Sequence, residues 1–179
     1  HEQYSSPTVV DGTVYIGSGD ENLYAMDAST GTEQWHFQTD GDVVPSPTVF
    51  DGSIYFGDDN GILYAVNAST GVEQWRFRTG STVGSSPTVV NGTVYIGSGY
   101  RLYAVDASTG SGQWQFQTDY WVHSSPTVVD GTVYVGSLDN NLYAVDAAAG
   151  GSSEGSRVVH WARGQQAVGK GDVAIGGDD

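Results

Sequence analysis

The sequence has no cysteine, one methionine and a single lysine, Lys170. Without cysteine the chain can form no disulfide, no thiolate metal site and no cysteine nucleophile. No apolar run approaches the roughly 20 residues that a membrane-spanning helix needs. Glycine is abundant, at 26 of 179 residues, but it does not recur at every third position, which excludes a collagen-like chain. The chain begins at His1 without a signal-like apolar segment, so we expect a processed protein or an excised segment.

Positive charge is also scarce, because 6 Lys and Arg residues stand against 21 Asp and Glu residues for a formal net charge of -15. Such a field repels nucleic-acid phosphates and anionic lipids, so we expect neither as a partner. Self-repulsion of this kind costs stability unless salt screens it, and we interpret the composition as adaptation to a salt-rich environment, with an ordinary acidic surface as the alternative. Hydrophobic residues at 38% and aromatic residues at 12% exclude intrinsic disorder.

A repeat of about 40 residues dominates the sequence. The segment that begins at Ser5 returns from Pro45, Ser85 and Ser124. Its turn glycines are spaced by 40, 40 and 39 residues: Gly12, Gly52, Gly92 and Gly131. We place the repeats of a single domain, 1–179, at residues 5–44, 45–84, 85–123 and 124–164, with a partial repeat at 165–179.

Each repeat has the pattern of four short strands. In the first repeat, residues 7–10 lead through the turn Asp11-Gly12 into a strand over 13–18, followed by strands over 23–28 and 33–39. In the last full repeat, residues 158–161 are the predicted fourth strand. No segment shows apolar residues at helical spacing. Four antiparallel strands in about 40 residues form one blade of a β-propeller, so the predicted fold is an all-β propeller of about four and a half blades.

The stretch from Ala25 to Trp35 resembles the tryptophan-docking motif, Ala-x-Asp-x-x-Thr-Gly-x-x-x-Trp, of the quinoprotein (PQQ-like) propeller repeats. The pattern recurs at residues 65–75 and 104–114, while residues 144–154 lack its threonine and tryptophan. The resemblance implies that each indole packs between neighbouring blades, over small residues that leave room for it. The residues that match the structural positions of the motif are Ala25, Gly31, Trp35, Ala65, Gly71, Trp75, Ala104, Gly110 and Trp114.

The family resemblance bears on function in two opposite ways. The family includes PQQ-dependent alcohol dehydrogenases, an outer-membrane assembly lipoprotein, and repeats attached to bacterial and archaeal protein kinases. The dehydrogenase cofactor stacks on a disulfide of adjacent cysteines beside a calcium ion, and that site cannot be carried over to a chain without cysteine. The resemblance therefore favours a non-catalytic scaffold without a cofactor, with a dehydrogenase fragment that uses PQQ and calcium as the alternative. It also favours an exported or cell-surface protein, of the kind found in haloarchaea.

The positions where the repeats disagree point to binding. The loops that leave the fourth strand are residues 40–44, 80–84 and 119–123, and only the last is aromatic, with Tyr120, Trp121 and His123. Variable loops on a rigid frame commonly carry binding, so we predict a protein or small-molecule site here, at the mouth of the central channel. The alternative is that these rings cap the adjacent blade. A second irregularity is Tyr100-Arg101, in a hairpin shortened by one residue.

Other residues of chemical interest have structural explanations. Most aspartates occupy turn positions that recur in every repeat, and the tip Asp58-Asp59-Asn60 lacks the ligand spacing of a calcium loop. The four histidines show no metal-ligand spacing, and no nucleophile lies in a recognisable pair with a base. We therefore predict no catalytic and no metal site.

Repeat blades bury their faces against neighbouring blades, so an open row leaves an apolar face at each end. Relatives usually close with seven or eight blades. We therefore expect either a homodimer through the terminal blades or further blades in a longer parent protein.

Overall fold

The computed structural model describes residues 5–148, 150 and 156–160, and this part of the chain consists of strands, turns and loops without any helix. It follows that no helix able to cross a membrane occurs among the described residues. The strands form four separate antiparallel sheets, each in sequence order. The first sheet has β1 (Thr8–Val10), β2 (Thr13–Ser18), β3 (Asn22–Asp27) and β4 (Glu33–Gln38). The second has β5 (Thr48–Phe50), β6 (Ser53–Gly57), β7 (Ile62–Asn67) and β8 (Glu73–Arg78). The third has β9 (Thr88–Val90), β10 (Thr93–Ser98), β11 (Arg101–Asp106) and β12 (Gly112–Gln117). The fourth has β13 (Thr127–Val129), β14 (Thr132–Gly136), β15 (Asn141–Asp146) and β16 (Ser156–His160).

These sheets confirm the predicted four-stranded blades. The predicted fourth strand of the last repeat is present as β16, which begins two residues earlier than predicted, at Ser156, and pairs with β15 from Val145 onwards. The loop before β16 is longer than in the other repeats, and the missing tryptophan removed the marker that locates this strand elsewhere. The partial repeat at 165–179 and Trp161 lie outside the described residues.

The first hairpin of each blade depends on two residues with positive φ. Asp11 has φ 48° and Gly12 has φ 76°, and the equivalent pairs in the other three blades have nearly the same values. Positive φ at both central residues gives the two-residue turn whose twist matches that of the flanking strands. Asp or Asn followed by glycine is the dipeptide that adopts this turn at least cost, so this local sequence fixes the register of each hairpin.

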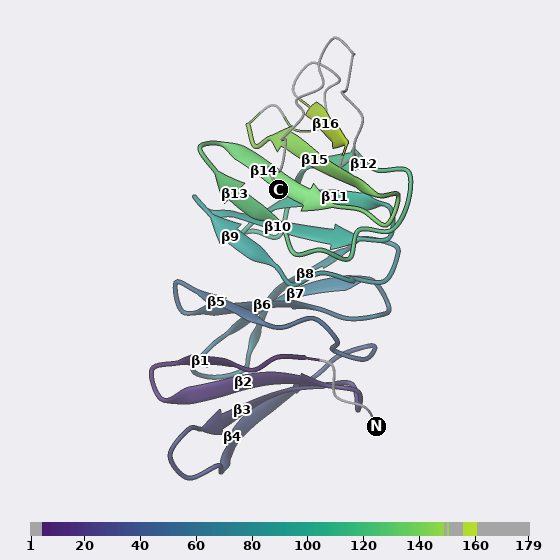
Figure 1. Ribbon diagram of the computed structural model, residues 1–179. Coiled ribbons are helices and arrows are strands. Elements are labelled where there is room, and N and C mark those ends of the chain that lie inside the picture. The colour runs from purple at the N-terminus through teal and green to yellow at the C-terminus, as the bar shows by residue number, and fades with distance from the viewer. Residues whose placement is uncertain (1–4, 149, 151–155, 161–179) are drawn as a thin grey trace, which may run out of the picture.

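The four blades follow one another along an open arc, with the first and fourth blades at its two ends (Figure 1). The short first strands lie side by side, β1 against β5, β5 against β9 and β9 against β13. Side-chain hydroxyls link these strands: Thr8 Oγ1 donates to the carbonyl of Pro47 at 2.6 Å, and the backbone N–H of Ser6 donates to Ser46 Oγ at 3.0 Å. The same two bonds recur at each junction, so the repeated Ser-Pro-Thr segment fastens one blade to the next.

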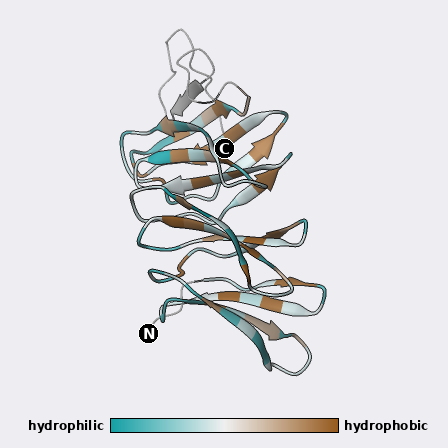
Figure 2. Cartoon of the chain, turned by 180° about the vertical axis from the view of Figure 1, so that it is seen from behind, coloured by the Kyte–Doolittle hydropathy of each residue, from teal (hydrophilic) through white to brown (hydrophobic). Residues whose placement is uncertain are grey.

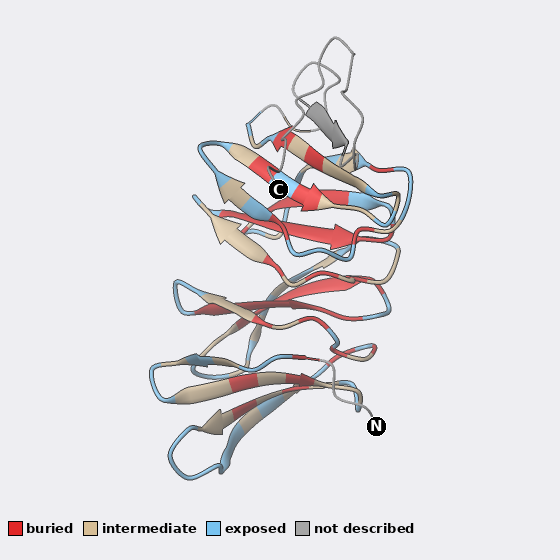
Figure 3. Cartoon of the chain, viewed as in Figure 1, coloured by how far each residue is buried: buried red, intermediate tan, exposed pale blue. Residues whose placement is uncertain are grey.

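Three hydrophobic cores lie between the blades rather than within them. In the first core, Leu23 and Ala25 of one sheet pack against Phe56 and Tyr64 of the next, all without exposure to solvent. The second and third cores repeat this arrangement between the following pairs of blades. Hydrophobic residues accordingly occur along the strands of each blade (Figure 2). Buried residues form the most continuous runs in the two middle blades (Figure 3).

The end blades expose faces that are buried in the middle of the arc. Tyr134 on the fourth blade is 37% exposed, whereas its equivalents Tyr15, Tyr55 and Tyr95 are 3 to 5% exposed. On the first blade, Val14, Ile16, Tyr24 and Met26 are only half-buried, while the equivalent residues of the second blade are fully buried. The described chain therefore presents an apolar face at each end.

Candidate functional site

The loop that carries the predicted binding residues is fastened to the tips of two blades. Thr118 Oγ1, just after β12, lies 2.6 Å from the carbonyl oxygen of Tyr120 and 2.9 Å from that of Tyr100, within reach of both for its single hydrogen. The N–H of Val122 donates to the carbonyl of Gly99 at 2.8 Å, and the carbonyl of Trp121 accepts from the N–H of Leu138 in the fourth blade at 2.8 Å. The loop is thus a rigid bridge between the third and fourth blades.

Val122 anchors this loop in the hydrophobic core. Its side chain is fully buried, and a Cβ placed on Gly97 of β10 would lie 2.5 Å from its Cγ1. Only glycine leaves room for the valine at this point of the strand. Because Val122 points into the core, its neighbours in the loop are left at the surface, where Tyr120 is 46% exposed.

The rings of this loop meet Tyr100 from the shortened hairpin and form what we call the aromatic cluster: Tyr100, Tyr120, Trp121 and His123. The centroid of the Tyr100 ring lies 5.4 Å from that of Tyr120 and 5.6 Å from that of Trp121, the latter edge to face. Trp121 in turn lies 5.7 Å from His123, also edge to face. Such contacts hold the rings in fixed orientations and leave part of their faces open, since Tyr100 is 42% exposed.

The structure therefore brings together two irregularities that lie about 20 residues apart in the sequence. Tyr120, Trp121 and His123 were predicted as site residues, and Tyr100 and Arg101 were noted only as an unusual hairpin. The shortened turn is the sequence feature that singles out Tyr100, and in the structure this residue lies beside the loop. Sequence alone could not establish that contact.

Beside the aromatic cluster lies a groove of about 320 Å³ between the second and third blades, which we call the cluster groove. Tyr100 and Trp121 form one side of it, and Arg101 and Gln117 project from β11 and β12. Its lining is made of aromatic, hydroxyl, amide and glycine residues and Arg101, with neither an acidic nor an aliphatic side chain among the described residues that line it.

The polar floor of the cluster groove is already internally bonded. Ser98 Oγ donates to Thr79 Oγ1 at 2.7 Å and lies 2.6 Å from the carbonyl of Ser81. The Tyr103 hydroxyl donates to the carbonyl of Thr79 at 2.9 Å, and Tyr103 and Thr79 are both buried. These bonds make the floor a fixed surface. Arg101 is the one charged residue among the described residues that line the groove.

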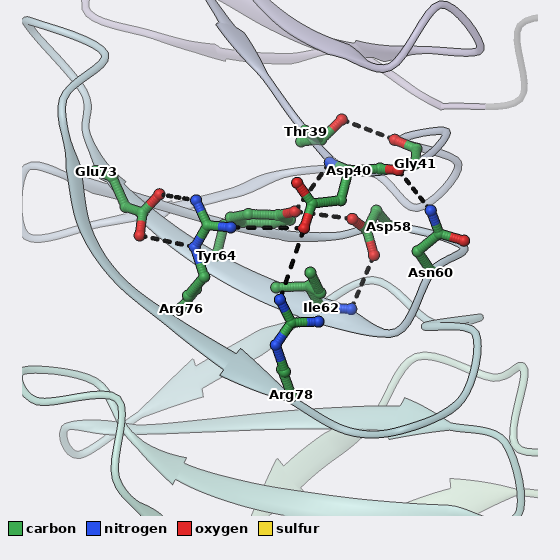
Figure 4. Close-up of polar contacts among 10 residues, drawn as sticks. All are labelled: Thr39, Asp40, Gly41, Asp58, Asn60, Ile62, Tyr64, Glu73, Arg76 and Arg78. Carbon is green, nitrogen blue, oxygen red and sulfur yellow. Dashed lines mark hydrogen bonds and ion pairs between the residues drawn. The ribbon is translucent and has the colours of Figure 1, made fainter.

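The equivalent place in the second blade has the opposite charge (Figure 4). Asp58 there is fully buried and accepts hydrogen bonds from the Ile62 N–H at 2.8 Å and from the Tyr64 hydroxyl at 2.9 Å. Burial raises the pKa of Asp58, and burial likewise raises the pKa of Tyr64 above its ordinary value. In the third blade Ser98 replaces this aspartate, and Arg101 stands where the second blade has Ile62.

The tyrosine–aspartate pair recurs in the end blades, so the third blade is the exception. The Tyr24 hydroxyl donates to Asp20 at 2.8 Å, and that of Tyr143 donates to Asp139 at 2.7 Å. The tip of the third blade reads Ser98-Gly99-Tyr100 without an aspartate, and the Tyr103 hydroxyl donates to the carbonyl of Thr79 instead.

Arg101 also differs from Arg76 and Arg78. Arg76 pairs with Glu73 at 2.6 Å and with Asp40 at 3.6 Å, and Arg78 lies 3.8 Å from Asp40 (Figure 4). Arg101 Nε donates to Gln117 Oε1 at 2.9 Å, and no carboxylate of the described residues forms an ion pair with it. Its guanidinium therefore keeps donors for a ligand.

Two larger grooves, of about 570 and 490 Å³, lie between successive blades at the hairpin turns. Both are lined by repeat-equivalent residues, such as Ser53 in the larger groove and Thr13 in the smaller, and the Ser53 hydroxyl donates to Gln74 Oε1 at 2.8 Å. Because they recur with the repeat, they follow from blade packing. They do not distinguish one blade from another.

The tryptophans of the docking motif lie at the junctions between blades. A Cβ on Gly71 would lie 2.7 Å from the indole of Trp35 in the preceding blade, and Gly110 has the same relation to Trp75. Trp114 likewise lies against Gly150. Each indole therefore meets the motif glycine of the following repeat, whereas Gly31 of the first repeat faces open space.

The hydrogen bonds of the three indoles are unequal. Trp75 Nε1 donates to the carbonyl of Ala107 and Trp114 Nε1 to that of Ala147, both at 3.0 Å. The buried Nε1 of Trp35 has no hydrogen-bond partner among the described residues. The motif alanines Ala25, Ala65 and Ala104 are fully buried, each directly opposite the tryptophan of its own blade.

The donor groups do not match a PQQ and calcium site. The chain has no cysteine for the disulfide on which that cofactor stacks in the dehydrogenases, and the described residues contain no group of three or more His, Asp or Glu side chains able to hold a metal ion. We therefore derive no chemistry through this cofactor.

Comparisons with known proteins place the fold among the quinoprotein-type propellers. BamB from Moraxella catarrhalis is 22% identical with a TM-score of 0.76, and the match covers 88% of this chain and 49% of BamB. Quinohemoprotein alcohol dehydrogenase from Comamonas testosteroni is 20% identical with a TM-score of 0.75, over 88% of this chain and 35% of the enzyme. The computationally designed Ika8 protein is 17% identical with a TM-score of 0.70, over 78% of this chain and 44% of the design.

The chain thus spans about half the length of BamB and about a third of the dehydrogenase. No curated protein gives a significant match in sequence. The sequence pattern of the family described as outer membrane protein assembly factor BamB matches residues 2–86 and 60–153, and the chain therefore belongs to this family of PQQ-like propeller repeats.

Proposed function

We propose that the chain is a non-catalytic propeller scaffold that binds a protein or small-molecule partner at the aromatic cluster. The carrying observation is the meeting of Tyr100, at a hairpin tip, with Tyr120 and Trp121, in the following loop, at a place where the repeats diverge in sequence and length. Partly exposed rings held on a fixed frame are typical of recognition sites, because they bind without losing much conformational entropy. In a closed propeller this edge would form one mouth of the channel.

The family supports a binding role. Its description names an assembly factor, which is a protein that acts through other proteins, and we extend this to the present chain as a proposal. A place as the repeat or sensor part of a larger protein, such as one with a kinase domain, agrees with the same role. The likeness to alcohol dehydrogenases, at 20% identity, supports only the scaffold. The charge of -15 opposes nucleic acid as the partner.

Printed arrays of glycans and of peptides test the proposal. The wild-type chain is compared in molar salt with a double variant, Tyr120→Ser plus Trp121→Ser, and with the control Phe50→Ser, which removes a 42% exposed ring from a different blade. We expect ligands that are bound by the wild type and the control and lost by the double variant. Equal binding by all three proteins, or no binding by the wild type, would contradict the proposal.

We also propose that two copies associate through their end blades. The exposed Tyr134 and the half-buried Val14 and Ile16 occupy positions that are buried wherever a neighbouring blade is present. Two sets of four blades also match the length of BamB, of which this chain spans 49%. A two-fold pair would cover these apolar faces.

A further inference from the structure

We propose that the cluster groove binds a sugar carrying a single carboxylate, of the uronic acid type, with Arg101 holding the carboxylate and Tyr100 and Trp121 contacting the ring. This inference rests on the proposed binding function and names the ligand class for that site. It begins from Arg101, which stands where the second blade has Ile62 and the end blades have Asn22 and Asn141, and from Ser98, which stands where the second blade has the buried Asp58.

The charge of the cluster groove is opposite to that of the molecule. The chain has 21 acidic residues, yet none of them lines this groove among the described residues, and Arg101 is the lining cation. Its Nε is bonded to Gln117, which fixes the plane of the guanidinium and leaves both terminal nitrogens for a ligand. A carboxylate fits this fork through two parallel hydrogen bonds, a geometry that an uncharged group cannot reproduce.

The lining also determines what the carboxylate is attached to. An aliphatic side chain of a peptide would need an apolar pocket, and the cluster groove has no aliphatic lining residue among those described. It offers instead ring faces beside hydroxyls, amides and the exposed backbone of Gly80. A polyhydroxylated ring satisfies both features, because its C–H face packs on an aromatic ring while its hydroxyls bond to polar groups.

The single lining cation limits the ligand to one carboxylate. Arg101 is the one charged residue among the described residues that line the groove, so it can pair with one carboxylate, and further carboxylates would find no cation there. We therefore expect a uronic acid residue that is free or at the end of a glycan, and not an internal run of acidic sugars.

Two methyl glycosides that differ only at one carbon test the proposal. Methyl β-glucuronide and methyl β-glucoside are titrated into the full chain in molar salt, with binding followed by calorimetry and by tryptophan fluorescence. The wild type should bind the glucuronide at least about tenfold more tightly, since hydrogen bonds to a charged group are the stronger ones. Arg101→Gln should bind the two sugars alike, and the matched control Arg78→Gln, whose arginine pairs with Asp40, should keep the preference.

The outcomes separate this inference from the proposed function. If Arg101→Gln keeps the preference, or if the wild type binds the two sugars equally or not at all, the inference is wrong, and the array experiment decides the function independently. If an acidic dipeptide binds more tightly than the glucuronide, the ligand is a peptide and the inference is again wrong. Trp121→Ser should lose both sugars, and unchanged binding by this variant would contradict the proposed site itself.

Discussion

At the residue scale, the junctions between blades depend on an indole from one repeat and a glycine from the next. Trp75 shows both halves of this contact, because its ring lies on Gly110 and its Nε1 bonds to the Ala107 carbonyl at 3.0 Å. Trp35 has the ring contact without the hydrogen bond. The two positions therefore allow the packing and polar contributions to be measured separately.

Replacing Gly110 by alanine should destabilise the protein more than the same change at Gly92. Both glycines have positive φ, +72° and +75°, so each alanine carries a backbone cost of roughly 1–2 kcal/mol. At Gly110 the new Cβ would also lie 2.7 Å from the Trp75 ring, while at Gly92 it meets nothing within 4 Å. Overpacking adds about 1–3 kcal/mol at Gly110. Urea unfolding measures the difference, and equal losses would show that the indole does not press on this glycine.

Trp75→Phe should cost more stability than Trp35→Phe. Both changes remove similar ring area, but only the first removes a hydrogen bond, and the second removes a buried donor that has no partner among the described residues. The expected difference in unfolding free energy is about 1–2 kcal/mol. Thermal and urea melts of both variants under one buffer give the comparison. A larger loss for Trp35→Phe would contradict it.

At the element scale, the turn between the third and fourth strands of each blade is organised by one side chain. Asp106 Oδ1 accepts hydrogen bonds from the N–H and hydroxyl groups of Ser108 and Thr109, at 2.7 to 3.0 Å. The Ser108 hydroxyl is the largest cause that lowers the pKa of Asp106 from 3.8 to about 2. In the second blade Asn67 makes the same turn with a neutral oxygen. The turn therefore works with either group, and only the aspartate makes it depend on pH.

Asp106→Asn should make the turn independent of pH. Because the folded pKa of Asp106 lies below its ordinary value, the carboxylate stabilises the fold above about pH 4, and this stabilisation disappears as the pH falls through about 2. The wild type should exceed the variant in unfolding free energy at neutral pH, and the difference should shrink steadily between about pH 4 and pH 2. Urea melts from pH 7 to 2, with an NMR titration of the carboxyl carbon, measure this. A difference that stays constant down to pH 2 would show that the negative charge of Asp106 does not stabilise the turn.

At the scale of the whole molecule, charge and open ends govern behaviour. The chain combines a net charge of -15 with an arc of blades whose end faces are incompletely buried. The first property separates copies of the protein at low salt, and the second draws them together once the charge is screened. Salt should therefore change both stability and association.

Stability should rise from low salt to molar salt. Charges repel one another over a Debye length of about 10 Å in 0.1 M salt and about 3 Å in 1 M salt. In 1 M salt the repulsion among the 21 acidic residues therefore opposes the folded state much less. Thermal melts across a series of potassium chloride concentrations test this, and a melting temperature independent of salt would contradict adaptation to high salt.

Association should depend on the end faces. Light scattering in molar salt should give twice the chain mass of 18.9 kDa for the wild type and for the control Phe50→Glu. Tyr134→Glu, which places a charge on the exposed face of the fourth blade, should give the mass of one chain. A monomeric wild type at micromolar concentration would overturn the proposed dimer.

The sequence by itself determined the blades, because the features that form them are local. The dipeptide Asp11-Gly12 specifies a hairpin turn, and alternating residues such as those of β2 specify a strand, without reference to distant parts of the chain. Because each repeat is a local stretch of sequence, a comparison of the repeats was enough to single out the loop at 119–123 as the aromatic one.

Only the tertiary structure decided what lies between the blades. Which glycine receives each indole depends on how one sheet packs on the next, and the partner of Trp35 proved to be Gly71 of the following repeat. The meeting of Tyr100 with Trp121, and the acid-free groove around Arg101, likewise arise from packing between segments that the sequence keeps apart. Contacts of this kind are set by the twist and stacking of whole sheets, which no short stretch of residues encodes.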